Sequence, residues 1–332
     1  MAINLISDKK VWDQVVDNSP GGLLYHKWDF LKLIEKHSGF KLLSYGIYKG
    51  EELICVMPLF FKRIKGVKCL FSPPPQSGVP YLGFVMNATY HTLKQDKKES
   101  YINLVAEEVD REIKRISPNY FSASLIPGFV DVRPFKLLNF GINVEYTYML
   151  DLHRPLDDIW KDFTGLCRQN IRKGQGLNCK LKKSKDVSML TEFLRERYLE
   201  HGMNYLVNPG YLEELLKTFP CNMGLYYLHH DDRIIGASLN HEYNDWYLGW
   251  IGLTKARDKK YRYVIDAMLW SFIKQAKLQG YTKFEISGAN RPNLCRFRTK
   301  FNPRLELCMQ LYKKDFIGKL AEKIYLKYVK AA

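Results

Sequence analysis

Several common signatures of enzyme chemistry are missing from this sequence of 332 residues. Its seven cysteines are odd in number and scattered, without a Cys-x-x-Cys pair, which argues against both a disulfide framework and a zinc site. No Gly-x-x-x-x-Gly-Lys-Ser/Thr loop occurs, and no Ser-His-Asp or Cys-His constellation is evident. We therefore expect reduced thiols, no metal and no resident cofactor.

Long apolar runs are missing as well. None approaches the roughly 18 residues that a membrane-spanning helix needs, and Met1 to Ser7 show no basic region followed by an apolar core. These features predict a cytoplasmic protein and leave open a peripheral contact with the inner face of the membrane. Positive charge, in contrast, is abundant: 51 Lys and Arg against 35 Asp and Glu give +16. This excess favours an anionic partner such as nucleic acid, a nucleotide-linked sugar or a membrane surface.

The stretch from Gly224 to Arg304 has the clearest pattern of secondary structure. Short turn signals divide β-branched and apolar runs into a predicted antiparallel meander of three strands, Gly224–His230, Arg233–Tyr243 and Trp246–Thr254. Apolar residues at helical spacing follow from Val264 to Ala276, and Tyr281–Ser287 is a further predicted strand.

The first half of the chain has the same order of helix, three strands in a meander, helix and strand. Two halves of this kind indicate a domain duplication, with domains at residues 1–152 and 153–332. The predicted fold class is α+β, a sandwich of mixed, mostly antiparallel sheets flanked by helices. The order resembles that of the GCN5-related N-acetyltransferase (GNAT) fold, which implies a donor site between the fourth and fifth strands.

Two basic segments are candidate binding sites. Arg168 and Arg172 are four residues apart, so on a helix they share a face and can grip a phosphate or diphosphate; a solvated basic face is the simpler explanation. The loop 255–263 lacks the glycines that cradle the pyrophosphate of acetyl-CoA in GNAT enzymes. Its cations, with Tyr261 and Tyr263, suit a polyanion with stacking bases, unless the tyrosines only cover the sheet.

Three short motifs follow one another along the chain: Trp28-Asp29-Phe30-Leu31-Lys32, Arg168-Gln169-Asn170-Ile171-Arg172-Lys173 and Phe297-Arg298-Thr299-Lys300-Phe301. They resemble the Trp-x-x-x-Lys helix, the Arg-x-x-Ile-Arg-x-Ala helix and the Phe-Lys-x-x-Phe segment of the Fem-type (FemAB) aminoacyltransferases, a family that includes related GNAT-like acyltransferases. The resemblance extends from Tyr25 to Glu306, and it implies two tandem GNAT-like domains.

The resemblance also implies a reaction. An amine attacks the ester carbonyl of an aminoacyl-tRNA and forms an amide on a peptidoglycan-precursor peptide. Lys32 and Arg172 would hold the diphosphate of a nucleotide- or lipid-linked acceptor, while Phe297 and Arg298, with Lys300 two residues on, would be the catalytic residues. Arg298 stands where the family has lysine, and an arginine can only position the donor or stabilise negative charge. Gly174 replaces the family's alanine, which we expect to loosen the helix end.

The sequence therefore predicts an acyltransferase of the Fem type that uses aminoacyl-tRNA. Two alternatives remain: an acyl-CoA-dependent N-acyltransferase, and a non-catalytic protein of the same fold that binds RNA or a membrane surface. Aminolysis of an activated ester needs positioning and oxyanion stabilisation more than a protein base. The candidates for such a base are His201, His241 and Glu242.

Overall fold

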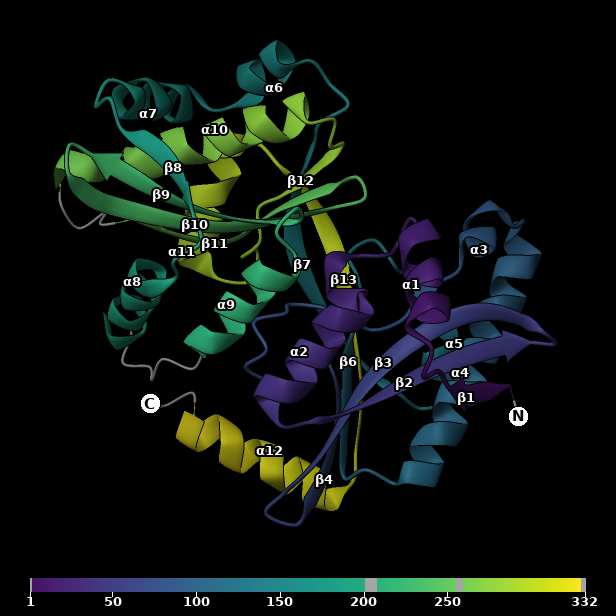
Figure 1. The fold of residues 1–332 in the computed structure, drawn as a ribbon. Coiled ribbons are helices and arrows are strands. Elements are labelled where there is room, and N and C mark those ends of the chain that lie inside the picture. Colours follow the sequence, from purple (N-terminus) through teal and green to yellow (C-terminus); the bar gives the residue numbers. More distant parts are fainter. Residues whose placement is uncertain (1, 201–207, 255–258, 330–332) are drawn as a thin grey trace. The chain divides into compact units, whose positions relative to one another are not determined.

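The computed structural model describes residues 2–200, 208–254 and 259–329. The chain forms two compact units, one of Met1–Glu145 with Leu307–Ala332 and the other of Tyr146–Glu306. Both contain a mixed, mostly antiparallel sheet flanked by helices, as expected from the sequence (Figure 1).

The first unit is built on a sheet whose one parallel pair, β4 with β6, lies in its interior. In spatial order its strands are β1 (Ile3–Leu5), β2 (Lys41–Lys49), β3 (Glu52–Ile64), β4 (Val67–Ser72), β6 (Tyr120–Ser124) and β13 (Arg304–Lys314), with β5 (Val85–Met86) paired to β3. The predicted meander is confirmed by β2, β3 and β4, which pair in antiparallel order. The short strands β1 and β5 were not predicted, because three or two residues carry too little periodicity.

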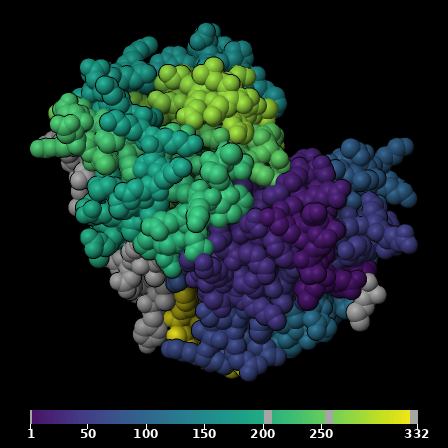
Figure 2. All heavy atoms as spheres, in the orientation of Figure 1, coloured from purple at the N-terminus to yellow at the C-terminus, as the bar shows by residue number. Residues whose placement is uncertain are grey.

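Helices cover both faces of this sheet. They are α1 (Lys9–Asn18), η1 (Leu24–His26), α2 (Trp28–Ser38), α3 (Ala88–Thr92), α4 (Gln95–Ile116), α5 (Arg133–Leu137) and α12 (Phe316–Val329). The helices α1 and α2 lie on the face toward the viewer, where their side chains form the purple surface of Figure 2, and α4 packs behind. The apolar side of α4, with Ile102, Val105 and Val109 fully or almost fully buried, joins the strands in one core.

The second unit has a sheet in the order β7 (Gly141–Asp151), β12 (Lys283–Glu285), β11 (Trp246–Thr254), β10 (Arg233–Tyr243), β9 (Met223–His230) and β8 (Lys180–Ser184). The predicted meander is confirmed here within one residue at its start. The lysine-rich β8 was not predicted as a strand, because an edge strand with exposed lysines lacks an apolar face.

The helices of the second unit are α6 (Leu156–Asp162), α7 (Gly165–Gln175), α8 (Ser188–Glu200), α9 (Pro209–Thr218), η2 (Lys259–Tyr261), α10 (Val264–Leu278), α11 (Pro292–Arg298) and η3 (Thr299–Phe301). One face of the sheet carries α10, with α7 packed against it, and the other carries α8 and α9 (Figure 1). Phe272 of α10 stacks on Tyr247 of β11, and Tyr247 stacks in turn on Phe284 of β12. These aromatic contacts fix α10 over the two parallel strands.

The predicted domains are residues 1–152 and 153–332, whereas the first unit ends at Glu145 and also takes the residues from Leu307 onward. The physical reason is strand pairing. β13 pairs antiparallel with β6, from Gln310 opposite Ser124 to Lys314 opposite Tyr120. Chain order alone does not reveal the partner of a strand that is distant in sequence.

Candidate functional site

The candidate site of the second unit begins where two parallel strands separate. β11 and β12 pair over three residues only, from Trp246 opposite Lys283 to Leu248 opposite Glu285. β12 then ends, whereas β11 continues to Thr254. Beside this point the pairing of β11 with β10 skips Trp250, which is a β-bulge. Bulges re-aim side chains and are common next to active sites.

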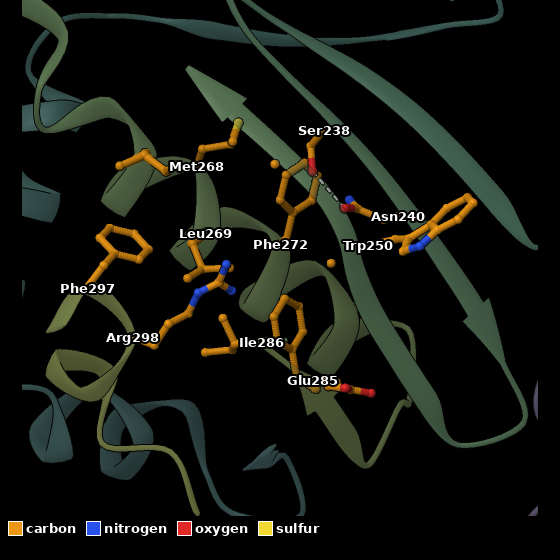
Figure 3. A pocket seen from close by; sticks show the side chains of 14 residues that line it. Ser238, Asn240, Trp250, Met268, Leu269, Phe272, Glu285, Ile286, Phe297 and Arg298 are labelled. Atoms are coloured by element: carbon orange, nitrogen blue, oxygen red, sulfur yellow. Dashed lines mark hydrogen bonds between the residues drawn. The ribbon is translucent and has the colours of Figure 1, made fainter. Parts of the chain in front are cut away.

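A pocket of about 60 Å³ lies at this separation (Figure 3). A buried water needs roughly 10–15 Å³ of such volume, so the pocket holds a group of a few heavy atoms, such as a small acyl group. Its lining is mostly apolar and includes Ile265, Leu269, Phe272, Ile286 and Phe297. Such a lining excludes water from a bound ester and strengthens electrostatic interactions inside.

Arg298 brings a positive charge into this apolar lining. Its side chain reaches from α11 toward Leu269 (Figure 3), and its buried Nε has no hydrogen-bond partner among the described residues. Burial lowers the pKa of Arg298 to about 10, and the carboxylate of Glu285 opposes this shift. The guanidinium is therefore still charged at neutral pH. A buried cation with an unused donor is suited to an anion or a developing oxyanion.

Polar side chains at the wall of the pocket form a buried chain that the sequence did not single out. Ser238 Oγ donates to Asn240 Oδ1 at 2.7 Å, and Asn240 Nδ2 donates to the Tyr247 hydroxyl at 2.9 Å. Ser238 and Asn240 alternate with apolar residues on β10, so a polar pattern of period two in a buried strand was the signal that could have revealed them.

Glu285 is a second pocket residue that sequence reasoning missed. It is 1% exposed, and Thr147 Oγ1 donates to its Oε1 at 2.6 Å. It ends β12, a strand of three residues that also contains Lys283, and so short a strand gives no pattern. Its negative charge raises the pKa of Arg298 and so helps to keep that guanidinium charged.

Of the three predicted catalytic residues, Phe297 and Arg298 line the pocket. Lys300 has a different environment: its ammonium forms an ion pair with the almost fully buried carboxylate of Asp266 on α10, and it lies 4.1 Å from the centre of the Phe297 ring. Burial raises the pKa of Asp266, and Lys300 opposes that shift. The ion pair fastens η3, and with it the end of α11, to α10.

The two arginines predicted to grip phosphate do lie on one helix, α7, but their surroundings differ. Arg168 donates from one nitrogen to the carbonyl oxygens of Lys161 and Phe163, at 2.7 and 2.5 Å, and so covers the end of α6. The Arg172 guanidinium lies 5.7 Å from the centre of the Trp160 ring and is exposed. Arg172 is thus the better placed of the two to meet a ligand.

Gly174 does not simply loosen the end of α7. The helix continues through it to Gln175, and a Cβ at this position would lie 2.6 Å from the Tyr263 carbonyl oxygen. The glycine permits the close approach of α7 to the start of α10.

The basic aromatic loop 255–263 is described from Lys259 onward, and positions 255–258 lie outside the described residues. Tyr261 is buried, and its hydroxyl is 3.2 Å from His230 Nδ1, so it covers the sheet. Tyr263 is different, because the charged groups of Lys173 and Arg262 lie over its ring at 5.2 and 4.5 Å. A cationic, aromatic surface therefore borders the start of α10.

Lys32 belongs to the first unit. It lies on α2, where it pairs with Glu35 at 2.8 Å and lies over the Trp28 ring at 5.4 Å. About half of its side chain remains exposed, at 49%. An exposed cation of this kind is available to a phosphate, and the observation does not by itself distinguish it from other surface lysines.

The candidate general bases do not contribute to the pocket lining within the described part of the chain. His241 is buried, which lowers its pKa to about 3. Glu242 accepts a hydrogen bond from Tyr281 at 3.0 Å, and burial raises its pKa. His201 lies outside the described residues.

The first unit fills the equivalent place with its own chain. β4 and β6 run parallel from Cys69 opposite Tyr120 to Ser72 opposite Ala123. Beyond them the loop after the prolines turns inward, where Tyr81, Leu82 and Phe84 are buried and Leu82 N donates to Ser124 O at 2.9 Å. The opening that could take a donor is thus occupied by side chains.

No group of three or more His, Cys, Asp or Glu in the described residues is arranged to hold a metal ion. A search of helices over the same residues finds none long and apolar enough to cross a membrane.

Comparison with known proteins gives a match to one domain model and a fold. Residues 166–292 match the model of the acetyltransferase (GNAT) domain, and no curated protein matches the sequence. Among solved structures, FemX superposes with a TM-score of 0.71 at 11% identity, over 99% of this chain and 100% of that one.

Two further structures resemble the whole chain. The C-terminal domain of a putative lysylphosphatidylglycerol synthetase from Agrobacterium fabrum has a TM-score of 0.58 at 13% identity and covers 95% of this chain and 94% of its own. A tandem GNAT protein from the clavulanic acid biosynthesis pathway has a TM-score of 0.55 at 8% identity, over 94% and 98% of the two chains. At these identities the likeness establishes the fold, and the expected tandem GNAT architecture is confirmed.

Proposed function

We propose, from the membership of residues 166–292 in the GNAT family of acyltransferase domains, that the second unit transfers an aminoacyl group from tRNA to an amine on a phosphate-bearing cell-envelope precursor. The observation that carries this proposal is the charged Arg298, with its buried Nε, in an apolar pocket where β11 and β12 separate. The Fem-type motifs supply the choice of substrates.

The chemistry follows from the charge of Arg298. The neutral amine attacks the ester carbonyl, a C–N bond forms, and the carbonyl oxygen becomes an oxyanion. Arg298 donates to this oxyanion, while Phe297 and the apolar lining keep water away. The C–O bond to the ribose then breaks, and the alcohol leaves with the proton that the amine loses. Arg298 is charged throughout and cannot carry that proton, so water or a substrate group relays it from the amine to the leaving oxygen.

Lys300 supports this reaction indirectly. Its ion pair with Asp266 fastens the segment that carries Phe297 and Arg298 to α10. We therefore assign it the role of a positioning residue, whose loss displaces the guanidinium from the pocket. A shift of about 1 Å at a reacting group costs on the order of 100-fold in rate.

The surface at the start of α10 supports tRNA as the donor. Lys173, Arg262 and Tyr263 present stacked cations and an aromatic ring there. Stacking of bases on aromatic side chains and neutralisation of phosphates are how single-stranded nucleic acid ends are bound. For the acceptor, the resemblance assigns the diphosphate to Lys32 and Arg172. Arg168 already donates to two carbonyls at the end of α6.

An acyl-CoA donor is the second candidate. It is favoured by the match of residues 166–292 to an acetyltransferase domain and by the pocket volume of about 60 Å³, which is enough for a short acyl chain. The same Arg298 would then stabilise the oxyanion, and a thiol would leave.

The decisive experiment measures amide formation by the purified protein from charged tRNA or acyl-CoA and amine-bearing envelope precursors. Arg298→Gln is expected to reduce kcat by roughly 100- to 1,000-fold, the usual effect of losing one oxyanion donor. Arg296→Gln, an exposed arginine on the same helix, is the matched control and should retain activity. Lys300→Met should lower kcat, and Lys300→Arg should restore part of it.

The proposal fails if no amide forms with either donor, or if Arg298→Gln is as active as the wild type. RNA binding without turnover, with only a shallower salt dependence in Arg298→Gln, would identify a non-catalytic binder instead.

A further inference from the structure

The C-terminal helix α12 has a side that is fixed to the first unit. A Cβ at Gly318 would lie 2.0 Å from the Asn119 carbonyl oxygen, so the helix backbone rests directly on the chain before β6. One turn later Glu322 accepts hydrogen bonds from the Tyr120 hydroxyl at 3.1 Å and from Lys314 at 2.7 Å. Gly318 and Glu322 therefore mark the packed side of α12.

Large apolar side chains occupy another side of the same helix and are exposed. Their exposed fractions are 82% for Phe316, 52% for Ile317, 52% for Leu320, 51% for Ile324 and 47% for Tyr325. Residues 316, 320 and 324 are four apart, and so are 317 and the small Ala321, so together they form one continuous stripe. Scattered exposed apolar residues are ordinary, but a contiguous stripe indicates an interaction surface.

Positive charge borders the stripe. Lys319 and Lys323 are exposed on α12, and neither forms an ion pair within the described residues. The acidic residues of this segment are already engaged: Glu322 with Lys314, and Asp315 with the Gly318 N–H and the Asn119 amide. The sequence continues with Lys327 and Lys330. The surface thus combines an apolar stripe with uncompensated cations.

We propose that α12 docks the protein on an anionic lipid surface, with the stripe of Phe316, Ile317, Leu320 and Ile324 inserted among the headgroups and Lys319 and Lys323 against their phosphates. A helix with an apolar side and a lysine-rich border lies in the plane of the interface. Charge complementarity selects this partner, because a protein partner of typical interface composition would bury few lysines. This docking is independent of the proposed acyl transfer.

The test is sedimentation of the full-length protein with two kinds of vesicle. One consists of phosphatidylcholine alone, and in the other about one lipid in three is the anionic phosphatidylglycerol. Binding is expected to the anionic vesicles and to weaken with salt. Phe316→Ser should weaken it by about tenfold or more, and Lys319→Gln with Lys323→Gln by roughly 30-fold at low salt. Leu278→Ser, which alters an 81% exposed leucine on α10 of the second unit, should bind as the wild type does.

Acyl transfer to a soluble acceptor should be unchanged in all these variants, which separates this test from that of the proposed function. Absence of binding to anionic vesicles overturns the proposal. So does a Phe316→Ser protein that binds vesicles normally but has a lower melting temperature or a different oligomeric state, because the stripe would then be a protein contact.

Discussion

At the scale of single residues, burial decides what each ionisable group can do. Arg298 loses hydration and keeps its charge, with a pKa of about 10, because a guanidinium has a large margin above neutral pH. The ordinary pKa of a lysine is closer to neutral pH, so the same burial could make a lysine neutral. An arginine at this position therefore keeps a positive charge in an apolar site and cannot serve as a base.

Burial keeps two histidines neutral, one in each unit, whereas Arg298 stays charged. It lowers the pKa of His26 to about 4 and that of His241 to about 3. His26 remains neutral with both nitrogens used, since Nδ1 accepts from Leu23 N at 3.1 Å and Nε2 donates to Leu82 O at 2.8 Å. Unfolded, both histidines would titrate near pH 6.5.

The pH dependence of stability follows from these shifts. The unfolded chain binds protons below pH 6.5 that the folded chain does not, so the stabilisation is complete above pH 6.5 and is lost as the pH falls toward 4 and 3. Lowering the pH from 7 to 5 should reduce the free energy of unfolding by about 2 kcal/mol for each of the two histidines. Urea denaturation at the two pH values measures this change. His241→Leu should remove its share of this slope, whereas His153→Gln, with a 70% exposed side chain, should not. Equal stability at pH 7 and 5 would contradict the assignment.

At the scale of elements, the site depends on how closely α7 approaches α10. Gly174 lies on the contact between the two helices, where a methyl group would come within 2.6 Å of the Tyr263 carbonyl oxygen and 2.8 Å of Ala267 Cβ. The backbone cannot yield as a flexible side chain can, so any larger residue forces the helices apart. Ile265 and Leu269 on α10 line the pocket, which connects this packing to the site.

Gly174→Ala should therefore destabilise the second unit by about 1–3 kcal/mol, the usual cost of overpacking, and should lower acyl transfer. Gly176→Ala is the matched control two residues later. Its Cβ would meet carbonyl oxygens at 3.5 and 3.6 Å, which is ordinary contact, and its φ of −64° suits alanine. Thermal and urea unfolding of both variants provide the measurement. A Gly174→Ala protein as stable as Gly176→Ala would exclude the close approach.

At the scale of the whole molecule, two units of one fold differ in the place where a donor could bind. In the first unit, Tyr81, Leu82 and Phe84 fill the space beyond β4 and β6, and Leu82 is tied to Ser124 by a backbone hydrogen bond. In the second, β11 and β12 separate around a pocket that contains Arg298. Both units therefore contain the sheet, and the opening is described in the second unit.

The expected consequence is one donor site per chain. Titration of the protein with a non-hydrolysable aminoacyl-tRNA end analogue or with CoA, followed by calorimetry or native mass spectrometry, should give a stoichiometry of one. Arg298→Gln should weaken binding of an acyl-bearing ligand if Arg298 donates to the carbonyl as proposed, because the pocket then loses its positive charge. A stoichiometry of two would mean that a ligand displaces the loop of Tyr81 and Leu82. The first unit would then also have a donor site, contrary to this prediction.

The sequence by itself determined the two meanders with the helix and strand after each, the positive charge, and Phe297 and Arg298 as candidate site residues. These features depend on local periodicity and composition, which can be recognised without knowing the tertiary contacts of each residue. It also indicated that α7 would carry Arg168 and Arg172 on one side. It could not indicate that Arg168 donates to the carbonyls at the end of α6, because that contact depends on how two helices meet.

Only the tertiary structure decided where the opening lies and which residues surround it. Ser238 and Asn240 on β10 line the same pocket as Arg298 on α11, although they lie far apart along the chain. The pairing of β13 with β6, the ion pair of Lys300 with Asp266 and the filling of the first unit's opening were decided in the same way. Strand partners and buried contacts are chosen by the packing of the entire unit, which no local pattern of residues encodes.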